Sequence, residues 1–187
     1  MKVLLRLGVM AMLLLAVGTD AGGQTQFSVC DSEKPREAVI WAQKFRQGSG
    51  TGFGAASDIV PAHGHDSQAI MVYPAPVFLH EISWVYEVTV GRECTMELFV
   101  EYATAASRIV EVRLLLFPEP PKPGTADPTT LIGSFGTPTG GWGTKEMREQ
   151  LVGSIKLTPN AINQLIFRTQ QATGIPHLKR IIFRPKL

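Results

Sequence analysis

Apolar and polar residues alternate along several short stretches of this chain. Two stretches show the alternation most clearly. One face of residues 82–90 would carry Ile82, Trp84, Tyr86, Val88 and Val90, and one face of residues 95–103 would carry Met96, Leu98, Val100 and Tyr102. A period of two, with β-branched and aromatic residues, is the signature of a β-strand that buries one face. Residues 108–117 continue the pattern as a third strand.

Further strands are predicted between clear turn signals. They cover residues 37–45, 68–72, 129–135, 149–157, 161–169 and 178–184. Between them lie predicted loops or turns at residues 47–66, 91–93, 118–124, 136–143 and 158–160, rich in Gly, Pro or small polar residues. A helical turn near residues 145–151 is the one helical alternative. About eight or nine short strands with such spacing predict an all-β fold, an antiparallel β-sandwich of the jelly-roll kind.

The N-terminus has a different pattern. Lys2 and Arg6 precede an apolar run over residues 7–17, and small or polar residues follow as far as Gly23. This order predicts a signal peptide over residues 1–23, cleaved after Ala21 or Gly23, and a secreted or periplasmic protein. The alternative is an uncleaved anchor, although the run is shorter than the roughly twenty residues of a spanning helix. No later segment is apolar enough to be transmembrane.

Composition supports one domain over residues 24–187. That length, about 165 residues, allows a real core, and neither a repeat nor a linker divides it. The 44% of hydrophobic residues excludes a disordered chain, and the net charge of +2 offers no basic surface for nucleic acid. The 18 glycines and 13 prolines favour many short elements over a helical bundle.

The chain has two cysteines, Cys30 and Cys94. In an oxidising compartment they are expected to pair, which would stabilise the fold by about 4 kcal/mol because the bond closes a long loop.

The order of several short motifs is familiar. Residues 84–90 read Trp-Val-Tyr-Glu-Val-Thr-Val, residues 98–103 end in Tyr-Ala, and residues 137–142 read Thr-Pro-Thr-Gly-Gly-Trp. With the opening stretch 40–45 and the closing strand 178–183, the chain resembles the carbohydrate-binding modules of families 6 and 35, which are galactose-binding-like β-jelly rolls. The resemblance covers nearly the whole of residues 24–187, and the Thr-Gly-Gly-Trp element is its most specific part.

The resemblance implies a ligand site among loops at one edge of the sandwich. In such modules an aromatic ring of the Thr-Gly-x-Trp loop stacks on a sugar, which here would be Trp142. Tyr73 is the best match for a second aromatic residue, and His177 stands where a polar residue precedes the last strand. His80 and Glu81 are nearby loop residues that would help to orient the sugar.

Two departures argue against the structural calcium of these families. Gln43 stands where a Glu is usual in the first strand, and Lys179 stands where an Asp is usual in the last. Because calcium prefers several anionic oxygens, we expect no cofactor. His177 replaces the usual Asn, which alters the expected ligand specificity.

The tryptophans can also be interpreted without the resemblance. Trp142 lies among glycines, so its ring can stand clear of the backbone and meet a sugar, or else fold inward to fill the edge of the core. Trp84 and Trp41 lie within predicted strands and are expected in the core.

Other chemistry has weaker signals. His63, His65 and Asp66, with His80, form a histidine-rich set that matches no strong zinc spacing. Most of the acidic residues such as Glu81, Glu87, Glu101 and Glu111 are expected on solvated strand faces, and neither a nucleophile elbow nor a phosphate loop occurs. The leading expectation is therefore an exported carbohydrate-binding module that is not an enzyme. The alternatives are a cell-envelope protein–protein interaction or structural module with the same fold, and a small metal-dependent enzyme.

Overall fold

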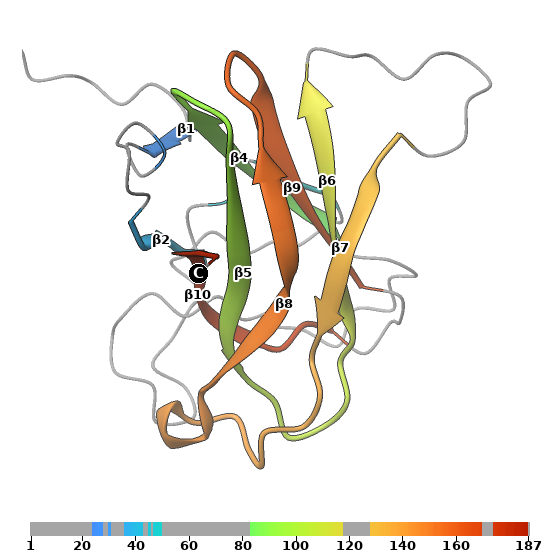
Figure 1. Cartoon of the computed structure of the whole chain (residues 1–187). Coiled ribbons are helices and arrows are strands. Elements are labelled where there is room, and N and C mark those ends of the chain that lie inside the picture. The colour runs from blue at the N-terminus through green and yellow to red at the C-terminus, as the bar shows by residue number, and fades with distance from the viewer. Residues whose placement is uncertain are drawn as a thin grey trace, which may run out of the picture.

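The computed structural model of the chain describes residues 24–27, 30, 36–42, 45, 47–49, 83–117, 128–169 and 174–186. Within these residues the secondary structure is almost entirely β, in two packed sheets (Figure 1). The predicted all-β sandwich is confirmed. None of the helices in the described part of the chain is long and apolar enough to cross a membrane. The predicted signal peptide lies outside the described residues.

The first sheet has six strands. Its main order is β1-β4-β9-β6-β7, and β3 also pairs with β4. The strands are β1 (Gln24–Phe27), β3 (Gln47–Ser49), β4 (Ser83–Val90), β6 (Val110–Phe117), β7 (Thr130–Phe135) and β9 (Ile162–Thr169). All pairs are antiparallel except β1 with β4, which is parallel.

The second sheet has four antiparallel strands in the order β2-β10-β5-β8. They are β2 (Ala38–Trp41), β5 (Cys94–Ala103), β8 (Arg148–Leu157) and β10 (His177–Pro185). A 3-10 turn, Thr144–Glu146, precedes β8 and takes the place of the helical turn expected there.

The predicted strands in the described residues are confirmed, with small shifts at their ends, except that the strand expected at residues 37–45 is shorter: β2 ends at Trp41. Two strands were missed, β1 and β3. β3 lies at the start of the expected loop 47–66, because its Gln-Gly-Ser sequence carries no alternation and forms a strand only by pairing with β4; β1 likewise forms by pairing with β4. The short strand expected at residues 68–72 lies outside the described residues.

Alternation defines the core, as expected. The inward faces of β4 and β5 are buried along their length, and Trp84 is fully buried. The ring of Phe167 in β9 lies 5.3 Å from Trp84 and 5.2 Å from Tyr86. The indole N–H of Trp84 donates to the Tyr86 hydroxyl, which itself donates to the carbonyl oxygen of Ala42 at 2.5 Å. The polar atoms of these large rings are thus satisfied inside the core.

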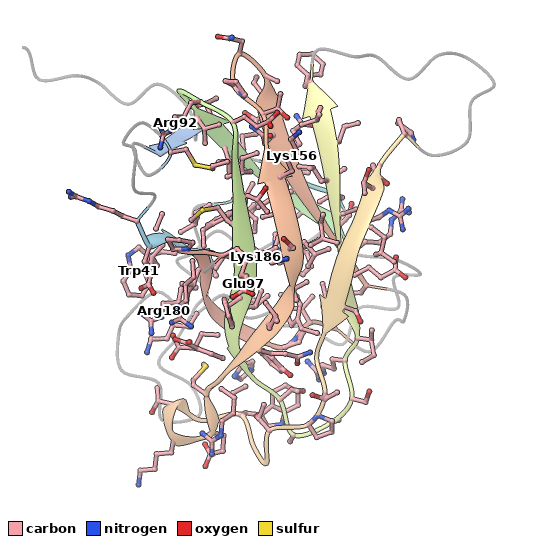
Figure 2. All side chains as sticks on the ribbon, viewed as in Figure 1. Trp41, Arg92, Glu97, Lys156, Arg180 and Lys186 are labelled. Carbon is pink, nitrogen blue, oxygen red and sulfur yellow. A yellow bond between two sulfur atoms is a disulfide. The ribbon has the colours of Figure 1, made fainter. Side chains whose placement is uncertain are left out.

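Trp41 corrects a prediction. It was expected in the core, but it lies on the outer face of the second sheet and is 39% exposed. Its neighbour Ile40 points inward instead, so β2 has the opposite phase to the one assumed. Figure 2 shows Trp41 beside Arg180 on this outer face, in agreement with their pairing across β2 and β10.

Glu87 and Glu101 correct a second prediction. Both were expected to be solvated, yet they are only 4% and 8% exposed. Glu87 accepts a hydrogen bond from Gln164 at 2.9 Å. Glu101 pairs with Lys179 at 3.3 Å and also with Arg180. Neighbours on adjacent strands therefore neutralise or hydrogen-bond these carboxylates.

The ion pairs continue across the outer face of the second sheet. Arg184 bonds Glu37 at 2.7 Å and Glu149 at 2.8 Å, and its guanidinium lies 4.7 Å above the ring of Phe99. Ile182, which pairs with Phe99, is fully buried although it is absent from the core cluster between the sheets. The charged side chains thus help to cover the apolar pair Phe99 and Ile182 on this face.

At one side of the sandwich, two glycines allow the edges of the two sheets to approach each other closely. The edge strands β7 and β8 run side by side there (Figure 1). A Cβ atom on Gly133 would overlap the carbonyl oxygen of Val152, and one on Gly153 would overlap that of Ile132. The two sheets can approach this closely only because neither residue has a side chain.

The disulfide between Cys30 and Cys94 is present, with the two Cα atoms 5.9 Å apart. Both cysteines are buried, and the bond ties the segment between β1 and β2 to the start of β5.

Candidate functional site

Three chain segments meet at one end of the sandwich. They are the β5–β6 loop (residues 104–109), the β7–β8 loop (136–147) and the segment before β10 (174–176); the first two are at the bottom of Figure 1. The backbone N–H of Arg108 donates to the Gly136 carbonyl at 2.9 Å, and that of Thr139 donates to the Thr104 carbonyl at 2.8 Å. The two longer loops are therefore bonded to each other as well as to the sheets.

Threonine and tyrosine side chains reinforce this contact. The buried Thr104 donates its N–H to Thr139 Oγ1 at 3.0 Å and its hydroxyl to the Ala106 carbonyl at 2.6 Å. The Tyr102 hydroxyl donates to Gln150 Oε1 at 2.6 Å and lies 3.1 Å from Thr137 Oγ1. The base of the loop cluster is thus preorganised by hydrogen bonds.

Two glycines give the β7–β8 loop its shape. Gly136 has φ of 112° and Gly140 has φ of 106°, a region that L side chains rarely adopt. Gly136 also lies against the carbonyl of Arg108, where a Cβ would overlap it. The loop can then turn back and place Trp142 against the other two segments.

Trp142 is partly exposed, and its ring is in contact with Arg108 of the β5–β6 loop and with His177 at the start of β10. The guanidinium carbon of Arg108 lies 4.2 Å from the ring centroid. The ring of His177 lies 4.9 Å away, tilted by 46°. The Arg108 guanidinium thus packs over the ring, while Trp142 as a whole is neither fully buried nor fully exposed.

His177 lies close to Trp142. It is the first residue of β10 and is 8% exposed. Its Nδ1 lies 2.9 Å from the carbonyl oxygen of Trp142. Because a carbonyl can only accept, this contact requires the proton on Nδ1, and Nε2 of the neutral ring is then an acceptor.

Arg108 is the residue that sequence reasoning missed. Its Nη1 donates to the carbonyl of Ile175 at 2.7 Å, so one side chain joins all three segments. Gly174 lies close to the same guanidinium, where a Cβ would come within 3.1 Å of Nη1. Partial burial lowers the pKa of Arg108, but an arginine remains charged at neutral pH. No local signal could reveal this role, because every partner is distant in sequence.

The remaining predicted site residues, Tyr73, His80 and Glu81, lie outside the described residues, as do His63, His65 and Asp66. The residues that the structure does describe contain no group of three or more His, Cys, Asp or Glu side chains placed to hold a metal ion. Gln43 is also outside them. Lys179, at the second position compared with the calcium ligands, pairs with Glu101 instead.

Several solved structures have a fold similar to that of this chain. A family 35 carbohydrate-binding module from Cellvibrio japonicus matches with a TM-score of 0.53 and 15% identity, over 81% of this chain and 94% of that module. Another family 35 module, Xyl-CBM35, determined in complex with a disaccharide that contains glucuronic acid, matches with a TM-score of 0.51 and 14% identity, over 80% of this chain and 98% of that one. A family 6 module matches with a TM-score of 0.49 and 14% identity, over 80% and 94%.

The two family 35 matches confirm the resemblance at the level of the fold: the chain has the β-sandwich of carbohydrate-binding modules. Sequence comparison adds nothing further, because no protein-family model and no curated protein matches the chain.

Proposed function

We propose that this protein is an exported, non-catalytic carbohydrate-binding module whose ligand lies against the loop cluster around Trp142. The observation that carries the proposal is the contact between Trp142 and His177, two residues that the resemblance assigned to one site from distant parts of the sequence. A partly exposed tryptophan offers an apolar surface to the C–H groups of a sugar, and His177 holds the backbone of that residue through the Trp142 carbonyl.

The proposal is supported by the fold and by the disulfide. The two similar structures with TM-scores of 0.53 and 0.51 are carbohydrate-binding modules. A buried disulfide is typical of a protein that folds in an oxidising compartment, which agrees with the predicted signal peptide. Tyr73, His80 and Glu81 remain proposed members of the same site.

A glycan array with matched tryptophan variants tests the proposal. Trp142→Ala is expected to abolish or strongly weaken binding. Trp41→Ala is the control, because Trp41 is exposed on the outer face of the second sheet rather than at the loop cluster. Binding by both variants at the wild-type level, or no glycan bound by the wild type, would contradict the proposal.

A protein–protein interaction module is the second candidate. Several large apolar side chains are exposed on the strands, namely Trp41, Phe117, Leu131 and Leu151. Under this alternative, no glycan binds and the polar variant Leu131→Ser or Leu151→Ser weakens association with an envelope protein, whereas Trp142→Ala has no effect.

A further inference from the structure

Among the strands of the described residues, only β1 pairs with its neighbour in parallel. It lies along the second half of β4, from Glu87 to Val90, while β3 pairs with the first half of β4 (Figure 1). The other side of β4 is occupied by β9. Without β1, the second half of β4 would therefore present an open strand edge, and such an edge is a template for pairing with another strand.

The chain that connects β1 with β4 is long. Parallel strands cannot be joined by a tight turn, and here the connection passes through β2 and β3 before it reaches Ser83. β1 has only four residues and can make only a few hydrogen bonds. Its pairing with β4 therefore depends on a covalent link that raises the local concentration of one strand beside the other.

The disulfide between Cys30 and Cys94 supplies that link. Cys30 follows shortly after the end of β1, and Cys94 is the first residue of β5, just beyond the turn that ends β4. Because Phe27 pairs with Val90, the bond joins the two strands at the ends that already lie together. It does for this parallel pair what a tight turn does for a hairpin, and it fixes β1 to the β4 of the same chain.

Before the bond forms, β1 can pair with β4 within one chain or between two chains. The strands are joined by backbone groups, and the β4 edge of a second copy presents the same groups in the same register. β1 is also synthesised well before its partner, because the two cysteines are 64 residues apart. Exchange of an identical element between copies is a low-cost route to a dimer.

We propose that β1 is an exchangeable strand, and that residues 87–90 of β4 bind the β1 of a second copy when the two cysteines are reduced. Pairing of Cys30 within its own chain gives the monomer, and pairing with Cys94 of another copy gives a covalent dimer with exchanged strands. This proposal does not depend on carbohydrate binding.

In both products the bond forms by thiol–disulfide exchange with a small disulfide such as oxidised glutathione. The Cys30 thiolate attacks one glutathione sulfur and releases one glutathione thiolate. The Cys94 thiolate then attacks the Cys30 sulfur of this mixed disulfide and releases the second glutathione thiolate. The product therefore depends on which Cys94 lies beside Cys30 when the second step occurs.

Two complementary variants test the exchange. Cys94→Ser keeps Cys30 beside β1, and Cys30→Ser keeps Cys94 beside β4. The two chains, one with a tag that changes its size, are refolded together from the reduced state with oxidised glutathione and separated on a non-reducing gel. The heterodimer is expected to exceed the homodimers about tenfold, because strand pairing raises the effective concentration of the matching thiols. Homodimers in comparable amounts would overturn the proposal.

Proline substitutions show whether the pairing of β1 is responsible. In the Cys94→Ser chain, Thr25→Pro together with Gln26→Pro removes two successive backbone donors, one of which faces β4. The heterodimer yield should then fall about tenfold. Arg36→Pro is the matched control, because Arg36 is exposed and lies in no strand, and the yield should persist. A yield that the prolines in β1 leave unchanged would contradict the proposal.

The wild type provides a second measurement if either variant does not fold. Isotope-labelled and unlabelled wild-type chains are reduced, unfolded, mixed and refolded with oxidised glutathione at increasing protein concentration. The covalent dimer should increase with concentration, and its linked Cys30–Cys94 peptides should combine labelled with unlabelled halves. No dimer at the highest concentration, or linked peptides of uniform isotope composition, would overturn strand exchange. A glycan array without any bound sugar would contradict only the proposed function.

Discussion

The guanidinium of Arg108 lies 4.2 Å from the centroid of the Trp142 ring, although the two residues belong to different loops. The same arginine bonds the Ile175 carbonyl ahead of the last strand. The glycine-rich loop that carries Trp142 is thus held by a cation and by hydrogen bonds, rather than extending freely into solvent. Under the proposed function, a ligand would meet a preorganised surface here, which reduces the entropy lost on binding.

Calcium removal should leave ligand binding unchanged. Lys179 is paired with Glu101, so a cation of the protein already stands at one position compared with the calcium ligands of families 6 and 35. Dialysis against EDTA, followed by a glycan-binding assay and a thermal melt, is the measurement. A fall in melting temperature or affinity that added calcium reverses would show the expectation to be wrong.

Adding a methyl group at the closed side of the sandwich should destabilise the fold. Gly153→Ala and Gly133→Ala each place a Cβ on a carbonyl of the facing edge strand, so we expect a loss of about 1–3 kcal/mol, the usual range for overpacking. Urea denaturation measures the loss. Gly141→Ala is the control, because its new Cβ meets only the flexible Glu146 side chain; equal effects in all three variants would contradict the explanation.

Stability should fall at alkaline pH through Tyr86. Burial raises the pKa of this hydroxyl above its ordinary value of 10, so the unfolded chain loses the proton first as pH rises. The stabilisation is complete below about pH 10 and declines above it, by up to about 1.4 kcal/mol per pH unit. The free energy of unfolding, measured from pH 8 to 11, should therefore fall less steeply with pH in Tyr86→Phe, which lacks the hydroxyl. An equally steep fall in that variant would assign the effect to another group.

Reduction of the disulfide should lower stability by about 4 kcal/mol, because the bond joins residues 64 positions apart. The double variant Cys30→Ser, Cys94→Ser should show the same loss without reductant, as measured by denaturant titration. A reductant that lowers the stability of the double variant would point to another cause, since the chain has no other cysteine.

Much of the fold followed from local pattern. The alternation in β4 and β5 identified both strands and their buried faces, because a period of two is a property of the strand itself. The same reasoning failed for Trp41, since a four-residue strand has no pattern long enough to define its phase. It also failed for Glu87 and Glu101, whose burial depends on partners from other strands.

The sequence by itself determined the longer strands, the turns between them and the glycine-rich loop that carries Trp142, because these depend on neighbouring residues. Trp142 and His177 were assigned to one site from sequence only through the family resemblance, and the tertiary structure places their rings 4.9 Å apart. Only the tertiary structure decided that Arg108 lies between them and Ile175, and that Gly133 and Gly153 close the sandwich. Contacts of this kind join segments that are distant in sequence, so their energy is set by how the two sheets pack rather than by any local preference.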